Sequence, residues 1–179
     1  NSYVPPARAG QGEMAYPLHA YVCERCWLVQ LEAFESPEHI FSDYAYFSGF
    51  SAGWLRHVEH YVAAMTERFG LGPHSKVVEV ASNDGYLLQY FIARGVPVLG
   101  VEPAANVAAV AREKGVPSEV AFFGRATAER LLAEGHGADL MAANNVLAHV
   151  PDILDFIAGF QVLLKRNGAG TFEFPHLLR

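Results

Sequence analysis

The stretch VVEVASNDGYLL, residues 77–88, decides the fold of this chain. A mainly apolar run turns at small residues and then feeds a helix, which is typical of the first strand, turn and helix of a doubly wound sheet. The stretch VLGVEP, residues 98–103, predicts the next strand, which ends at Glu102, 17 positions after Gly85. Together the two stretches predict an α/β fold built on a parallel sheet.

The ends of these two strands predict a pocket for a nucleoside. Backbone groups at Ala81–Gly85 can approach a ligand closely, and the carboxylate of Glu102 can accept hydrogen bonds from both hydroxyls of a ribose. A dinucleotide fingerprint, G-x-G-x-x-G, needs three glycines so that a pyrophosphate can sit at the helix N-terminus. Residues 81–86 contain one glycine, and we expect Asp84 to stand where a phosphate would approach. The pattern therefore favours S-adenosylmethionine (SAM) and disfavours a nicotinamide-dependent oxidoreductase.

Composition narrows the class of protein. The chain has 179 residues, of which 51% are hydrophobic, and a net charge of −6, so it can bury one core and carry a small appendage. Lys and Arg never cluster beyond two neighbours, which disfavours a nucleic-acid partner. No apolar run approaches the roughly 18 residues of a membrane span. Two nearby cysteines do not indicate an oxidising compartment, so we expect a cytoplasmic protein whose oligomeric state is open.

Three segments are expected along the chain. Residues 1–35 contain three prolines, Cys23, Cys26 and two short β-like runs at 18–22 and 27–31. Residues 36–72 have a helical pattern, with a start signal at Ser36 and one apolar face from Ala52 to Phe69. An aromatic-rich stretch at 44–48 interrupts this pattern, and Gly70 follows the helix.

From residue 73 onward, strands and helices alternate, which predicts at least five mostly parallel strands joined by right-handed crossovers. Gly95, Gly115 and Gly168 are expected to cap helices. The expected strands are 76–81, 97–102, 118–123, 138–143 and 169–174, and the expected helices are 84–94, 104–114, 125–134 and 152–165.

The carboxyl ends of parallel strands meet at one edge, so five loops should build the pocket. We predict that the backbone around Ala81, Asn83 and Gly85 faces the methionine part of the cofactor, and that Glu79 also belongs to the cofactor site. Taken singly, Glu79 could instead be a satisfied acid on the first strand, Gly85 a turn glycine, and Glu102 an exposed carboxylate that caps the next helix. We predict that Phe123 flanks the adenine, and that Asn145 holds the methionine moiety or lines the transfer site. His176 is a weaker candidate at the last loop.

The chain resembles the sugar C-methyltransferases that act on nucleotide-linked deoxy-ketosugars. The resemblance covers nearly the whole chain and rests on the motifs CERCWLVQL (23–31), DYAYFS (43–48), Glu79 with SNDG (82–85), GVEP (100–103), and ANN with HVP (143–151). It implies a zinc-ribbon-like module at 1–35, a helical linker or lid at 36–72, and a Rossmann-like class I methyltransferase domain that binds SAM at 73–179. The family's first C-x-x-C pair lies upstream of residue 1, and its Tyr/Glu/His segment associated with catalysis lies beyond Arg179. We therefore interpret the chain as a fragment, truncated at both ends and after the fifth strand, and expect it to be inactive alone.

Cys23 and Cys26 have the spacing of two zinc ligands. A structural zinc site needs four ligands, and His19 is the one additional donor nearby. The alternative is a pair of reduced cysteines in a small core. The resemblance favours zinc in the intact protein.

His149 and Tyr44 are the candidates for chemistry. Methyl transfer to carbon requires an enolate of the ketosugar, hence a base and donors for the enolate oxygen. A histidine has a suitable pKa, although the residues alone favour His149 as a helix-start residue bonded to backbone. The resemblance places both residues near the substrate, where we assign them to orientation and enolate stabilisation; Tyr46 is expected to pack. The alternatives are a SAM-binding module without chemistry, or an O- or N-methyltransferase for another small molecule.

Overall fold

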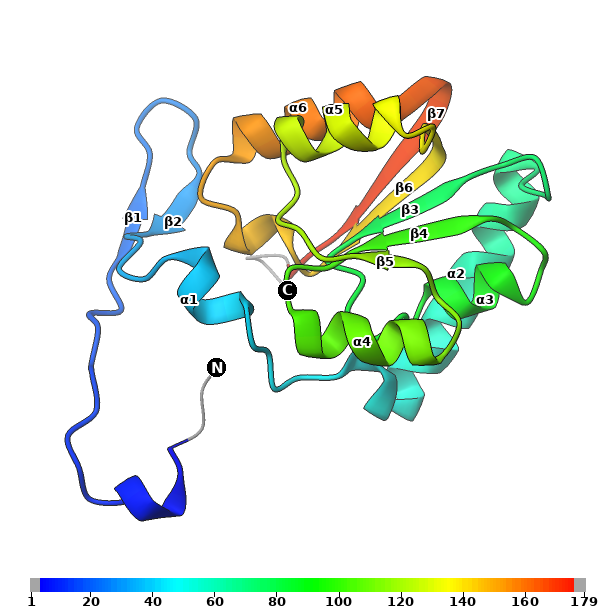
Figure 1. Cartoon of the computed structure of the whole chain (residues 1–179). Coiled ribbons are helices and arrows are strands. Elements are labelled where there is room, and N and C mark those ends of the chain that lie inside the picture. The colour runs from blue at the N-terminus through cyan, green and yellow to red at the C-terminus, as the bar shows by residue number, and fades with distance from the viewer. Residues whose placement is uncertain (1–3, 176–179) are drawn as a thin grey trace.

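A five-stranded parallel sheet forms the centre of the computed structural model, which describes residues 4–175 (Figure 1). The strand order is β5-β4-β3-β6-β7, so the chain reverses direction across the sheet between β3 and β6. This confirms the predicted doubly wound α/β class. The strands are β3 (Val77–Val80), β4 (Val98–Val101), β5 (Ser118–Glu119), β6 (Ala138–Asn144) and β7 (Leu164–Glu173).

Helices cover both faces of the sheet. Figure 1 shows α5 and α6 on one face, and α2, α3 and α4 on the other. This arrangement follows from right-handed crossovers that start in opposite directions from β3. The helices are α2 (Ala52–Phe69), α3 (Leu88–Ile92), α4 (Ala105–Glu113), α5 (Arg125–Ala133) and α6 (Ile153–Leu163).

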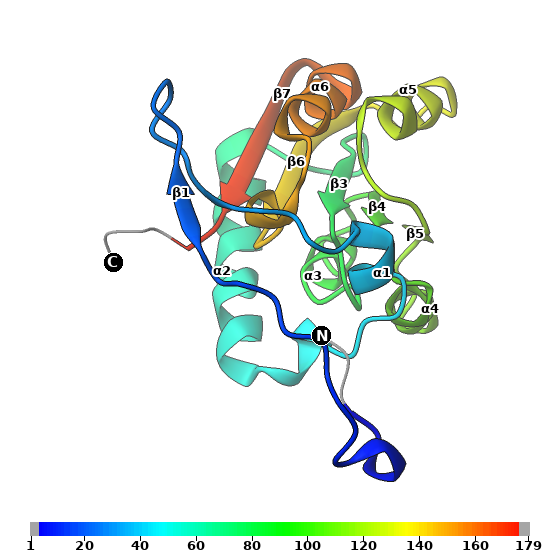
Figure 2. The same ribbon diagram turned by 90° about the vertical axis from the view of Figure 1, so that its left-hand side faces the viewer.

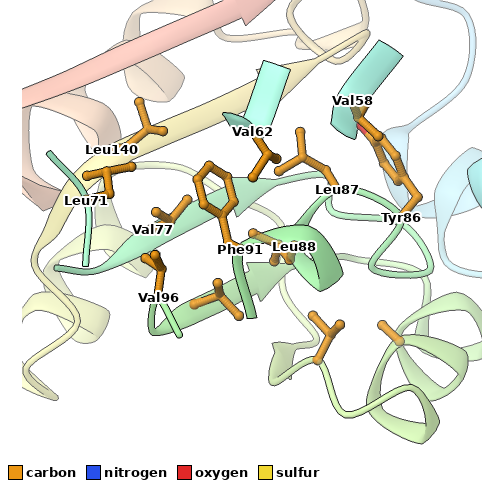
Figure 3. Close-up of a cluster of buried hydrophobic side chains, with 13 residues drawn as sticks. Val58, Val62, Leu71, Val77, Tyr86, Leu87, Leu88, Phe91, Val96 and Leu140 are labelled. Carbon is orange, nitrogen blue, oxygen red and sulfur yellow. The ribbon is translucent and has the colours of Figure 1, made fainter. Parts of the chain in front are cut away.

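The core beneath α2 and α3 shows why these helices pack there. Val58 and Val62, one turn apart on α2, are fully buried, and Phe91 of α3 lies beside them against Val77 and Leu140 of the sheet (Figure 3). The apolar periodicity of residues 52–69 thus predicted both the bounds and the buried face of α2. Gly70 ends the helix in the left-handed conformation, with φ at +60°, as a C-terminal glycine usually does.

Three elements, β5, α3 and β7, depart from their predicted bounds by four residues or more at one end. β5 has two residues, not six, and α3 begins at Leu88, not at residue 84, because Gly85 adopts a φ of +74° that no helix accepts. β7 begins at Leu164, directly after α6, and includes Gly168. The prediction that Gly168 caps a helix was therefore wrong. Its missing side chain instead permits close packing, since a Cβ there would lie 2.8 Å from the Ala138 carbonyl oxygen.

The N-terminal segment forms a small separate unit. β1 (Ala20–Val22) and β2 (Val29–Leu31) pair as an antiparallel hairpin that stands to one side of the main sheet (Figure 1). α1 (Pro37–Phe41) follows, and Ser36 caps it by accepting a hydrogen bond from the His39 N–H. α1 lies on the side to which the strands' carboxyl ends point (Figure 2). Three short 3-10 helices complete the described residues: η1 (Pro6–Arg8), η2 (Ser48–Phe50) and η3 (Leu147–His149). None of the helices within residues 4–175 is long and apolar enough to cross a membrane.

Gly100 provides a test of packing inside the sheet. It lies in β4, and a Cβ at this position would lie 2.9 Å from the Ser82 Cβ and 3.1 Å from the Ser118 Oγ. We expect Gly100→Ala to lower the free energy of unfolding by about 1–3 kcal/mol, because the buried strand cannot move aside. Urea denaturation measures the change. Gly72→Ala, where a Cβ meets open space, is the control, and equal effects of the two substitutions would contradict the packing argument.

Candidate functional site

A cavity of about 660 Å³ opens at the carboxyl ends of β3, β4 and β6. This is the edge at which ligands bind in doubly wound sheets, and the volume is in the usual range for small-molecule sites. Its wall combines the strand ends with the segment around α1 and with η3. Residues from these parts include Phe41, Tyr44, Tyr46, Trp54, Ala81, Asn83, Tyr86, Glu102, Phe123, Asn144, Asn145, His149 and Phe156.

Left-handed backbone shapes two of the turns in this wall. Ala81, Asn83 and Asn145 have φ values of +57°, +49° and +55°. Such a conformation costs a residue with a side chain roughly 1–2 kcal/mol, and strained residues of this kind gather at functional sites. The β3 turn thus adopts, with alanine and asparagine, a geometry for which many nucleotide-binding turns use glycine.

Glu102 closes the turn after β3. Its carboxylate is buried, Oε2 accepts a hydrogen bond from the Asn83 N–H, and Oε1 accepts one from the Ala104 N–H, each at 2.9 Å. Burial raises the pKa of Glu102, and the two N–H donors oppose that rise. Because each carboxylate oxygen has two lone pairs, each can still accept a hydrogen bond from a hydroxyl in the cavity.

Glu79 and Gly85, two further predicted cofactor residues, do not belong to the described cavity wall. Glu79 is fully buried in β3, and burial raises its pKa well above the ordinary 4.5. The nearby Tyr86 side chain opposes this rise in the pKa. Neither Glu79 carboxylate oxygen, however, has a hydrogen-bond partner within ordinary bonding distance among the described residues. Gly85 packs against Val116, whose Cγ2 would lie 2.7 Å from a Cβ.

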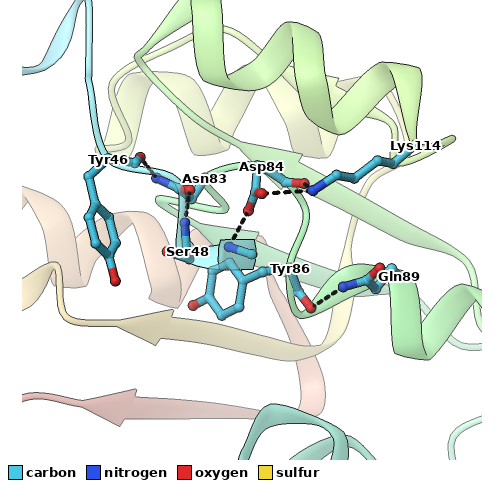
Figure 4. A network of polar contacts seen from close by, with 8 residues as sticks. Tyr46, Ser48, Asn83, Asp84, Tyr86, Gln89 and Lys114 are labelled. Carbon is cyan, nitrogen blue, oxygen red and sulfur yellow. Dashed lines mark hydrogen bonds and ion pairs between the residues drawn. The ribbon is translucent and has the colours of Figure 1, made fainter. Parts of the chain in front are cut away.

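Asp84 also differs from expectation. Its side chain is 3% exposed, pairs with Lys114 Nζ at 2.7 Å, and accepts a hydrogen bond from the Gly49 N–H at 3.2 Å (Figure 4). The residue is absent from the described cavity wall, so the prediction that its charge meets an approaching phosphate was wrong. The missing glycines remain the sequence argument against a dinucleotide.

Phe123 and Asn145 both line the cavity, as predicted. The Phe123 ring packs edge-on against Phe156 and Phe160, with centroids 5.6 and 5.5 Å away, so its position is fixed by the core beneath α6. The Asn145 N–H donates to the Glu173 carbonyl oxygen at 2.6 Å, which joins the ends of β6 and β7.

Tyr44 and His149 come together in this wall although 105 positions separate them. Phe41 contacts both rings, with centroids 5.7 Å from Tyr44 and 6.0 Å from His149. The His149 N–H donates to the Val146 carbonyl oxygen, so the backbone contact expected of a helix-start residue is present, while the ring lines the cavity. Tyr46, expected to pack, instead lines the cavity and is 55% exposed.

Several wall residues were missed from the sequence. The rings of Trp54 and Tyr86 lie tilted against each other in the wall, with centroids 5.9 Å apart, and Asn144 Nδ2 donates to the Tyr86 hydroxyl at 3.4 Å. The signal for Tyr86 was its place directly after the first turn. Trp54 resembled one more core residue of α2. His176 lies outside the described residues.

The hairpin β1–β2 presents Cys23 and Cys26 at its turn. The backbone N–H groups of Cys26 and Arg25 bond to the Cys23 sulfur, and this lowers the pKa of the Cys23 thiol. A metal ligand needs the thiolate form that such a shift favours. Within residues 4–175, however, no three His, Cys, Asp or Glu side chains are placed to hold one ion. The hairpin therefore carries two thiols that could serve as ligands, without a third such side chain beside them in the described part of the chain.

A match to a known sequence family decides the class of protein. Residues 78–169, half of the chain, match a sequence model described as "Methyltransferase domain". The chain belongs to this methyltransferase family. Residues 1–41 of the chain match a second model, described as "Putative zinc binding domain". The resemblance expected from the sequence is thus confirmed at the level of these two domains.

Individual relatives agree with this class. The chain is 36% identical to C-methyltransferase NovU of Streptomyces niveus over 93% of this chain and 40% of NovU. DesVI of Streptomyces venezuelae has a TM-score of 0.56 and 14% identity, over 71% of this chain and 53% of DesVI. Magnesium protoporphyrin IX methyltransferase of Synechocystis with bound SAM has a TM-score of 0.52 and 17% identity, over 65% and 57%. At these identities the two structures show the fold alone. The chain spans 40% of the length of NovU.

Proposed function

We propose that this chain is the SAM-binding part of an enzyme that methylates a carbon of a nucleotide-linked deoxy-ketosugar. The observation that carries the proposal is the position of Glu102, buried at the end of β4 in the wall of a cavity, beside the left-handed turn that ends β3. Identity of 36% with a C-methyltransferase over 93% of the chain supports transfer to carbon.

The cofactor end of the cavity has a role for each predicted residue. Glu102 accepts hydrogen bonds from the ribose hydroxyls, and Phe123 flanks the adenine. The turn at Ala81–Asn83 faces the methionine part, and Asn145, from the next strand, lies beside the transferable methyl group. Glu79 and Gly85 act on the cofactor through the turn, since they support it from outside the described wall. SAM itself supplies the reactive methyl group.

The acceptor end contains Tyr44 and His149. Carbon becomes nucleophilic when a base removes the proton next to the ketone, and the charge that develops on the enolate oxygen needs a hydrogen-bond donor. The Tyr44 hydroxyl donates to this oxygen, and His149 orients the sugar ring. SAM bound at the cofactor end would supply the methyl group to this carbon and leave as S-adenosylhomocysteine (SAH), and the proton would pass to a base other than Tyr44 and His149.

Zinc belongs to the N-terminal hairpin in this proposal. Cys23 and Cys26 supply two thiolates, and two further ligands come from outside the hairpin. Metal analysis of the longest polypeptide that the gene encodes should find one zinc per chain. Cys23→Ser should remove it, whereas zinc content that survives this substitution would exclude the hairpin.

Calorimetric titration of the chain with SAH tests the cofactor proposal. We expect micromolar binding of SAH and no heat with NAD, because the turn after β3 lacks the glycines of a pyrophosphate site. Binding of NAD without binding of SAH would contradict the proposed SAM site and favour a dinucleotide site. Binding of neither, by this chain and by the longest polypeptide of the gene, would remove the nucleoside site.

The acceptor is tested with the longest polypeptide, SAM carrying a ¹³C-labelled methyl group, and a panel of nucleotide-linked deoxy-ketosugars. NMR then locates the label. A new carbon–carbon bond is the expected result. A label on oxygen or nitrogen would replace C-methylation by the alternative chemistries, and SAH binding without transfer to the panel would favour a binding module.

A further inference from the structure

The aromatic loop, residues 44–50, lies between α1 and α2 in the chain and forms part of the cavity wall. Tyr44, Tyr46 and Ser48 of this loop contribute to the cavity wall. The loop is largely without regular structure, with η2 at its end. Its backbone groups therefore need partners elsewhere, and these partners decide where the Tyr44 ring lies.

The first partner is Asn106, in the first turn of α4. Its Nδ2 donates to the Tyr44 carbonyl oxygen at 2.9 Å, and its Oδ1 accepts from the Tyr44 N–H at 3.2 Å. One side-chain amide thus holds both backbone groups of Tyr44. Asn106 is exposed and absent from the described cavity wall, so it acts on the cavity through Tyr44.

The second set of partners is the turn after β3 (Figure 4). Asn83 Oδ1 accepts from the Ser48 N–H at 2.8 Å, and its Nδ2 donates to the Tyr46 carbonyl oxygen at 3.1 Å. Asp84, held by Lys114, accepts from the Gly49 N–H at 3.2 Å. Gly49 has to be glycine for this approach, since a Cβ would collide with the Asp84 carboxylate.

Asn83 therefore connects the loop to the cofactor end of the cavity. Its backbone N–H bonds to Glu102, while its side chain bonds to the loop. In the dinucleotide fingerprint its position belongs to the second glycine, which has no side chain to offer. The departure from that fingerprint supplies a side-chain amide that fastens the loop.

We propose that Asn106 is a positioning residue for Tyr44, and that Asn83 and Asp84 fasten the other end of the same loop. The proposal deepens the function proposed above, because Tyr44 must be held closely to stabilise an enolate. Asn106 shares this task with the turn after β3, and α4 supplies the rigid support.

Amide hydrogen exchange, measured by NMR on the whole chain, tests whether Asn106 holds the backbone of Tyr44. Asn106→Ala should speed exchange at the Tyr44 amide by about tenfold, the loss of about one hydrogen bond. The Ser48 and Gly49 amides, held by Asn83 and Asp84, should stay slow. Glu113→Ala, also exposed on α4, is the matched control and should leave all three unchanged.

Asn106→Asp separates positioning from helix stability. The carboxylate retains the acceptor for the Tyr44 N–H but loses the donor to its carbonyl oxygen. At the second residue of α4 it should also favour the helix through the dipole. We expect protection of the Tyr44 amide in the order Asn, Asp, Ala, while the melting temperature of the Asp variant is unchanged or higher. Unchanged Tyr44 exchange in Asn106→Ala would overturn the proposal.

Activity of the longest polypeptide supplies the second readout. Asn106→Ala should lower kcat by about tenfold with KM for SAM unchanged, and it should add little on a Tyr44→Phe background, because both changes remove one function. Full additivity would show that Asn106 does not act through Tyr44. Failure of the wild-type protein to bind SAH would refute the proposed function. The exchange experiment tests independently whether Asn106 positions Tyr44.

Discussion

Glu102→Ala should weaken SAH binding by about 1–3 kcal/mol, roughly a fivefold to 150-fold rise in Kd. The carboxylate is buried in the cavity wall, and its oxygens already bond to the Asn83 and Ala104 N–H groups. These N–H groups fix its orientation, so two ribose hydroxyls meet a preorganised acceptor with a charge. Calorimetry on both proteins gives the difference. Glu113→Ala is the control for loss of an acidic side chain.

The wild-type protein offers a test of Glu102 without substitution. Burial raises the pKa of this carboxyl above its ordinary 4.5, and the hydroxyl donors of the ligand favour the ionised form. Affinity for SAH should therefore fall as the pH drops toward and below that raised pKa, and level off above it. Affinity that is flat with pH, together with an unchanged Kd in Glu102→Ala, would remove the residue from the site.

The sequence was sufficient for the two strands β3 and β4 and for the helix α2. Residues 77–80 and 98–101 are short apolar runs between turn signals, and buried parallel strands require such runs. α2 was predicted to the residue because its apolar positions repeat over 18 residues and a glycine ends it. The apolar runs of the strands and the apolar repeat of α2 are both visible within a short stretch of sequence. The burial of these residues in the structure agrees with both patterns.

The cavity was predictable only in part. Glu102, Phe123 and Asn145 follow from the rule that parallel strands end at one edge. Asn106 does not, because its partner lies 62 positions away and a polar residue in the first turn of a helix looks like an ordinary surface residue. The start of β7 was predicted wrongly for a similar reason. Gly168 resembles a helix cap in the sequence, and only the nearby Ala138 carbonyl oxygen shows that its missing side chain serves strand packing.

Glu79 should make the protein less stable as the pH rises. Burial raises its folded-state pKa well above the ordinary 4.5, so the folded protein retains a proton that the unfolded chain releases. The folded state binds more protons in this range, and the free energy of unfolding therefore decreases with pH. The decrease is up to about 1.4 kcal/mol per pH unit from the unfolded pKa to the folded pKa, and nothing is lost below the unfolded value.

Glu79→Gln should remove this dependence, because the amide is neutral and close in shape. Urea denaturation at several pH values between 5 and 8 gives the free energy of unfolding of both proteins. The variant should gain stability relative to wild type by up to about 1.4 kcal/mol with each pH unit, until the pH passes the raised folded-state pKa of Glu79. Glu59→Gln, exposed on α2, should give a constant difference. A constant difference for Glu79→Gln as well would contradict the prediction. It would mean that the Glu79 carboxyl ionises as easily in the folded chain as in the unfolded one. The turn after β3 would then tolerate a negative charge directly beneath it.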